Sequence, residues 1–156
     1  MKLPKSIRIV NILVVFVMVS LMIACVVMMV LSDMSYQYQI HIGNDTCKIT
    51  SKALVATMLA FTTITAAFHT FYSLQTKAYI DQVEHGKNIF RYIEYSITAT
   101  IMIFTIAVLS NVSNVTSLIL ITIANFTMIL LGLAIDQGAN KNKILMVIAW
   151  LLFVGI

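Results

Sequence analysis

Hydrophobic residues fill long, nearly unbroken runs of this chain, and most charged residues lie in the breaks between the runs. An apolar run of about 20 residues is long enough to cross the roughly 30 Å hydrocarbon core of a bilayer as an α-helix. The pattern predicts four complete membrane spans and a fifth, shorter apolar stretch, over residues 9–31, 53–74, 88–110, 117–135 and 144–156. The predicted fold class is therefore an all-α, polytopic transmembrane helix bundle that forms a single domain.

The last apolar stretch is too short to cross a bilayer by itself. Its 13 residues, 144–156, give only about 20 Å of helix. The stretch ends on Ile156 without a polar or basic residue to close it. We therefore expect this chain to be the front part of a longer protein.

Two connections between the predicted helices carry local signals. Tyr36–Ile42 alternates polar and apolar residues with a period of two, and Gly43-Asn44-Asp45 follows, which is typical of a strand and a turn. The alternative is a structureless loop in which the alternation arose by chance. Residues 81–87 predict a charged turn, in which Gly86 can end one helix before the next begins.

Composition and charge place the chain in a membrane with a defined orientation. Hydrophobic residues make up 60% of the chain, charged residues 10%, and the mean hydropathy is +0.97, more than a soluble domain can bury. The net charge of +4 does not indicate nucleic-acid binding, because the basic residues form no patch with interleaved aromatics.

The Lys and Arg residues are distributed unequally between the two sides of the membrane. One side receives Lys2, Lys5, Arg8, Lys77, Lys87, Arg91, Lys141 and Lys143, and the other only Lys48 and Lys52. The positive-inside rule then predicts a cytoplasmic N-terminus in a multi-pass protein embedded in the lipid bilayer.

Glu94 is the only acidic residue inside any apolar span. An ionisable group in a transmembrane helix costs at least about 2.5 to 3.5 kcal/mol, so it faces a cavity or a partner. His69 lies at a similar depth in the preceding span, because the two spans are antiparallel neighbours joined on the cytoplasmic side. A carboxylate beside a histidine in a dry bundle can move protons or balance a buried cation. The alternative is a structural pair that only ties two helices together.

Further polar residues recur at helical spacing in three spans. Thr98 and Thr105 share a face with Glu94, Thr122 shares one with Asn125, and the span before Glu94 has a stripe formed by Thr62, Thr65, His69 and Tyr72. Such strips favour the bundle interior, where they can form hydrogen bonds across helices. No single threonine is diagnostic, since a threonine hydroxyl in a helix often bonds to the preceding turn.

Sequence signals for enzyme chemistry are missing. The chain has no recognisable nucleophile and base pair, no Gly-rich phosphate loop and no set of metal ligands. Cys25 lies in the first span and Cys47 in a polar loop, which does not favour a disulfide. We therefore do not expect an enzyme.

The segment around Glu94 resembles a known family. Arg91-Tyr92-Ile93-Glu94-Tyr95-Ser96 is similar to helix 3 of the heliorhodopsins, where an Arg, an aromatic, a variable residue and Glu-Tyr-Ser recur. The likeness extends to Ala67-Phe68-His69, Gly86-Lys87-Asn88 and residues 124–132, and to Asn11 more loosely. The resemblance implies a seven-helix retinal photoreceptor with a cytoplasmic N-terminus, usually a homodimer, whose first outer loop forms β-structure and whose signalling partner the sequence does not identify.

The resemblance also implies roles for individual residues. Glu94 would be the counterion of a protonated retinal Schiff base, and His69 would belong to a polar cluster linked to proton release and return. Thr98, Asn125 and Tyr95 would complete a polar pocket for the cofactor.

One feature departs from the family pattern. The family carries retinal on a lysine in the seventh helix, and no lysine lies inside any span of this chain. Two other functions therefore stay open. The polar faces could line a proton or ion path in a channel or transporter, with or without light as the gate. The chain could also be a truncated remnant, or a packing partner for another membrane protein, that binds no retinal.

Overall fold

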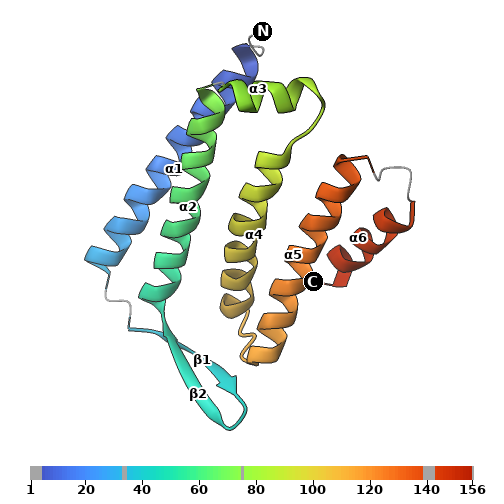
Figure 1. The fold of residues 1–156 in the computed structure, drawn as a ribbon. Coiled ribbons are helices and arrows are strands. Elements are labelled where there is room, and N and C mark those ends of the chain that lie inside the picture. Colours follow the sequence, from blue (N-terminus) through green and yellow to red (C-terminus); the bar gives the residue numbers. More distant parts are fainter. Residues whose placement is uncertain (1–4, 33–34, 75, 139–142, 156) are drawn as a thin grey trace.

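The computed structural model describes residues 5–32, 35–74, 76–138 and 143–155, and they form a row of helices with one β-hairpin (Figure 1). The elements in chain order are α1 (Lys5–Leu31), β1 (Gln37–Ile42), β2 (Asp45–Thr50), α2 (Ser51–Ser73), α3 (Lys77–Glu84), α4 (Ile89–Leu109), α5 (Val115–Asp136) and α6 (Lys143–Gly155). Helices α1, α2, α4 and α5 are long and apolar enough to cross a membrane, and α6 is shorter. The predicted all-α membrane helix bundle is confirmed.

Neighbouring long helices run antiparallel and pack in the order α1, α2, α4, α5, α6 (Figure 1). The short helix α3 crosses one end of this row, beside the start of α1, and the hairpin lies at the other end. We call these the α3 end and the hairpin end. Most apolar side chains of α1 face outward, as in Phe16, which is 72% exposed. Such a surface is stable only where lipid replaces water.

The hairpin forms where the polar and apolar residues alternate, which confirms the strand-and-turn prediction. Gly43, with φ of +59°, occupies the first position of its two-residue turn, where a left-handed conformation favours glycine. Ile40 pairs with Cys47 across the two strands. Ile40 is buried in the core of the hairpin end together with Leu54, Val108 and Leu118. The His41 backbone N–H also donates to the Ser113 carbonyl at 2.6 Å, which ties the hairpin to the α4–α5 connection.

The predicted charged turn over residues 81–87 is wrong in its first half, because α3 continues through Glu84. The Thr76 side chain caps the start of α3 by accepting a hydrogen bond from the Tyr79 backbone N–H at 3.4 Å. Tyr79 is the buried residue of this helix, and it shares one face with the half-buried Ile80 and Val83. Gly86, with φ of +67°, follows the helix end as predicted, since this conformation closes a helix best with glycine.

Close contacts between helices fix their relative positions. The Thr57 and Thr105 hydroxyls are 2.9 Å apart and join α2 to α4 near the hairpin end. Gly132 of α5 lets the Tyr92 ring of α4 approach, since a Cβ added there would lie 3.1 Å from Tyr92 Cε1. These contacts set the rotation of α4, and that rotation turns Glu94 away from the exposed surface.

Candidate functional site

Glu94 lies two turns into α4 from the α3 end, and its side chain is almost completely buried. Only 1% of the residue is exposed. Lipid-facing positions of the same helix are open by comparison, with Ile93 44% exposed. A carboxyl group in this position exchanges no hydrogen bonds with bulk water, so its partners in the protein decide its chemistry.

Tyr72 of α2 is the first partner of this carboxyl group. Its hydroxyl donates a hydrogen bond to Glu94 Oε2 at 3.0 Å, and Tyr72 is itself only 1% exposed. The α2 helix places Tyr72 one turn after His69, so both side chains point from one face of α2 towards α4. The Tyr72 and His69 rings also pack edge to face, with centroids 5.5 Å apart.

His69 is the second partner. Its Nε2 lies 3.7 Å from Glu94 Oε1, which confirms that the two residues are close, as their predicted depths required. The other ring nitrogen, Nδ1, lies 2.8 Å from Oδ1 of Asn11 on α1. Three helices therefore contribute to one line of polar contacts: Asn11 and His69 are within hydrogen-bond distance, His69 lies 3.7 Å from Glu94, and Tyr72 is hydrogen-bonded to the second carboxyl oxygen. We call these four residues the Glu94 cluster.

The geometry of the Glu94 cluster restricts where its proton can be. With Asn11 Oδ1 as acceptor, His69 Nδ1 carries a hydrogen. A neutral imidazole would then turn a bare Nε2 towards Glu94 Oε1, and two acceptors would face each other across 3.7 Å. One further proton, on the carboxyl oxygen or on Nε2, removes this conflict. With Asn11 in this orientation, the His69–Glu94 contact is favourable when either side chain carries that proton.

The other residues predicted for the site lie outside the Glu94 cluster. Thr98 is buried, and its hydroxyl donates to the Glu94 backbone carbonyl at 2.9 Å, a bond within α4. Tyr95 is 44% exposed on the outer side of α4. Asn125 of α5 is buried, and its Nδ2 has no hydrogen-bond partner among the described residues. None of these three side chains is hydrogen-bonded to the Glu94 carboxyl within the described ranges.

Sequence reasoning gave no site role to Asn11, which entered only as a loose point of resemblance, and it placed Tyr72 only in a general polar stripe. Asn11 lies in an apolar stretch near the start of α1, and only 4% of it is exposed. An asparagine in an apolar span is the signal that could have assigned it, since a polar group there needs a partner on another helix.

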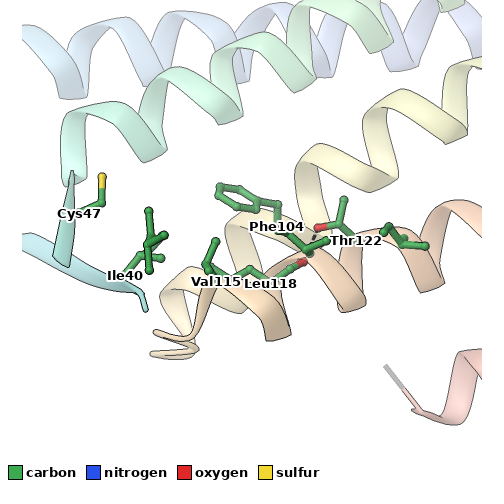
Figure 2. A pocket seen from close by; sticks show the side chains of 9 residues that line it. Ile40, Cys47, Phe104, Val115, Leu118 and Thr122 are labelled. Atoms are coloured by element: carbon green, nitrogen blue, oxygen red, sulfur yellow. Dashed lines mark hydrogen bonds between the residues drawn. The ribbon is translucent and has the colours of Figure 1, made fainter. Parts of the chain in front are cut away.

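Two cavities bear on the location of the site. The first, about 370 Å³, lies at the hairpin end between β1, β2, α4 and α5 (Figure 2). Its walls are almost entirely apolar, and the Thr122 hydroxyl is already bonded to the Leu118 carbonyl at 2.7 Å. The second, about 310 Å³, lies at the α3 end, where Asn11, Tyr79 and Arg91 help to line it. Only the second cavity reaches a member of the Glu94 cluster, so the α3 end is the better candidate for chemistry.

A metal centre finds no support in the described part of the chain. No three His, Cys, Asp or Glu side chains come together there in a way that could hold an ion. The Glu94 cluster itself supplies one carboxylate and one imidazole, and tyrosine and asparagine complete it. A carboxyl group beside an imidazole can hold and exchange a proton, or balance one buried positive charge.

Comparison with known proteins gives one match. The protein-family model described as Heliorhodopsin matches residues 5–155, a range that includes every helix and both strands. No curated protein matches the chain. The family match confirms the resemblance seen around Glu94 and extends it over nearly the whole sequence.

Proposed function

The chain belongs to the heliorhodopsin family, and from this we propose that it is part of a light-sensing retinal membrane protein in which Glu94 is the Schiff-base counterion. Bound retinal would supply light absorption and a positively charged iminium nitrogen. The protein's task is then to hold one negative charge in a dry interior close to that nitrogen. Glu94 is the acid that the described helices bury for this purpose.

The single observation that carries the proposal is the burial of the Glu94 carboxyl group together with its partners. A buried ion is tolerated only when its partners replace the lost water, and Tyr72 supplies one hydrogen bond at 3.0 Å. His69, 3.7 Å from the other oxygen, can take or return a proton as the charge nearby changes. These two residues therefore hold the carboxylate in place and buffer its charge.

The covalent attachment of retinal is a separate requirement. It needs a lysine amine within the bundle, and no lysine lies in the interior of α1, α2, α4, α5 or α6. Lys5, Lys77 and Lys143 are the first residues of their helices, and Lys52 is the second residue of α2. The residues present can supply the counterion, in Glu94. The attachment lysine would come from outside these 156 residues.

Orientation and assembly complete the proposal. The protein is an integral, multi-pass membrane protein, and we propose that the α3 end faces the cytoplasm because most Lys and Arg residues lie there. The Glu94 cluster would then lie in the cytoplasmic half of the bundle. We also propose that the protein functions as a homodimer, as the family resemblance implies.

Proton transport is the second candidate function, and one observation favours it. The line from Glu94 through His69 ends on Asn11, which also borders the cavity at the α3 end. A proton held by the His69–Glu94 pair therefore lies two side chains away from a cavity. In this alternative the polar faces of α2, α4 and α5 form a proton or ion path, with or without light as the gate.

Reconstitution of the protein from its full natural coding sequence with all-trans-retinal tests the proposal. We expect a visible absorption band, and we expect Glu94→Gln to displace it because the charge beside the iminium is removed. Asp45→Asn is the control, since it makes the corresponding change at an exposed acid of β2, away from the Glu94 cluster, and should leave the band in place.

The same preparation separates the alternatives. Absence of a pigment, or a band that Glu94→Gln does not move, contradicts the counterion role. A light-dependent current across a membrane that contains the protein, lost in Glu94→Gln, identifies a transporter. If the protein forms no pigment, and if the Glu94→Leu variant folds as well as the unsubstituted protein, the chain is a remnant or a packing partner.

A further inference from the structure

Helix α3 lies on the bundle through one face, on which Tyr79 is buried and Ile80 and Val83 are half-buried. Tyr79 is the buried residue of its eight, with 7% of its surface exposed. The opposite side of α3 exposes Lys77, Asp81 and Glu84. A helix of this length does not form by itself in water, so the order of α3 depends on what Tyr79 contacts.

Tyr79 stacks on Tyr72, the residue that binds Glu94. The two rings lie 4.8 Å apart at an interplanar angle of 25°. The hydroxyl of the same Tyr72 ring donates to Glu94 Oε2 at 3.0 Å. An unbroken series of contacts therefore leads from the buried carboxyl group to α3 at the end of the bundle. Phe71 packs edge to face against Tyr79, with centroids 6.3 Å apart, and limits the sideways movement of its ring.

A change at Glu94 has a direct physical route along this series. The Tyr72 ring is rigid, so its hydroxyl cannot follow a shifted carboxyl oxygen without moving the face on which Tyr79 stacks. Loss of the hydrogen bond would remove the contact that fixes the Tyr72 hydroxyl, so the ring could shift within its packing. Tyr79, the most buried side chain of α3, would then lose its fixed surface.

We propose that Tyr72 and Tyr79 are positioning residues that couple the state of Glu94 to the order of α3. The coupling itself rests on the contacts among these residues, and its use as the output of a light sensor rests on the proposed function. In that use, a light-driven change at the counterion alters the polar surface that α3 presents at the α3 end. Because coupling between two sites is reciprocal, a change in α3 must also alter the surroundings of the Glu94 carboxyl group.

Hydrogen–deuterium exchange of the protein in lipid nanodiscs tests the first direction. The reporters are α3 amides such as Ile80, whose N–H donates to the Thr76 carbonyl at 2.9 Å. We expect Tyr72→Phe, which keeps the ring and removes the hydroxyl, to speed their exchange by a factor on the order of ten, the factor that corresponds to about 1.4 kcal/mol. In a Tyr79→Leu background the same substitution should change α3 exchange no further.

A matched control removes a different bond between the same two helices. Thr57→Val breaks the 2.9 Å contact with Thr105 near the hairpin end and should leave α3 exchange unchanged. Equal exchange in Tyr72→Phe and in the unsubstituted protein overturns the proposal. Equal acceleration by Thr57→Val also overturns it, because the effect would then be general loosening of the bundle.

Infrared spectroscopy of the Glu94 carboxyl group tests the reciprocal direction. The band is identified by its loss in Glu94→Gln. We expect Tyr79→Leu to shift it, and Tyr79→Phe, which keeps the stacked ring, to restore it. An unshifted band in Tyr79→Leu refutes the coupling, and if that variant does not fold, the exchange measurement on Tyr72→Phe decides alone. Neither measurement needs retinal, so the coupling and the counterion role can fail independently.

Discussion

Removing the Tyr72 hydroxyl is the sharpest test of how the buried carboxyl group is stabilised. Tyr72→Phe deletes one oxygen atom and leaves the aromatic ring that packs against Phe68, His69, Phe71 and Tyr79. The substitution therefore removes no atom of the ring that makes these contacts. The change acts on the 3.0 Å hydrogen bond to Glu94 Oε2.

The expected loss of stability follows from the burial of both partners. Tyr72 and Glu94 are each 1% exposed, so water cannot replace the lost donor without entering the bundle. A hydrogen bond to a charged group contributes about 1.5 to 3 kcal/mol, and one to a neutral group about 0.5 to 1.5 kcal/mol. We expect Tyr72→Phe to lower the free energy of unfolding by about 1.5 to 3 kcal/mol if the carboxyl group is ionised, and by about 1 kcal/mol if it is protonated.

Equilibrium unfolding in mixed lipid and dodecyl sulfate micelles, followed by far-UV circular dichroism, measures this difference. Tyr36→Phe is the control, because Tyr36 is 62% exposed and its substitution should change stability by less than about 0.5 kcal/mol. Repeating Tyr72→Phe in a Glu94→Gln background isolates the contribution of the charge, since the amide oxygen accepts the same hydrogen bond without one. If Tyr72→Phe costs no more than Tyr36→Phe, the hydroxyl does not support the carboxyl group and the reasoning is refuted.

Two further predictions concern contacts between helices. Asn11→Leu leaves His69 Nδ1 without its 2.8 Å partner, so we expect a loss of about 1 to 3 kcal/mol in the same unfolding assay; an unchanged stability would show that Asn11 does not hold His69. Gly132→Ala places a methyl group 3.1 Å from Tyr92 Cε1, so the ring must move by a few tenths of an ångström, and we expect a cost of about 1 kcal/mol that Tyr92→Leu relieves. Independent, additive effects of these last two substitutions would contradict the close contact.

The hydrophobic pattern predicted most of the helical architecture because membrane helices are defined by local chemistry. A long apolar run must satisfy its own backbone hydrogen bonds in lipid, and an α-helix is the way that a single segment does so. The hairpin was predictable for a similar reason, since its period-two alternation and Gly43 act over neighbouring residues. Glu94 was identifiable as well, because one acid in an apolar span is unusual wherever the helices lie.

The sequence did not predict helix α3, because packing against the rest of the bundle determines whether that segment is ordered. Residues 77–84 are a short, mostly polar segment whose apolar face of Tyr79, Ile80 and Val83 makes barely two turns, and α3 is ordered once Tyr79 stacks on a buried ring. The cap at Thr76 is a local signal, but it gains its effect only once that anchor is in place.

The sequence by itself determined the membrane class, the long apolar helices, the hairpin, the family resemblance and the position of one acid, Glu94, within a span. Only the tertiary structure decided which residues surround that carboxyl group. Asn11 is 58 positions from its partner His69, and Tyr72 is 22 positions from Glu94. Periodicity states which residues share a face of one helix, but the rotation and depth of one helix against another come from packing across the whole bundle. The sequence therefore predicted the polar stripe on α2, and tertiary packing brought that stripe together with residues of α1 and α4 to form the Glu94 cluster.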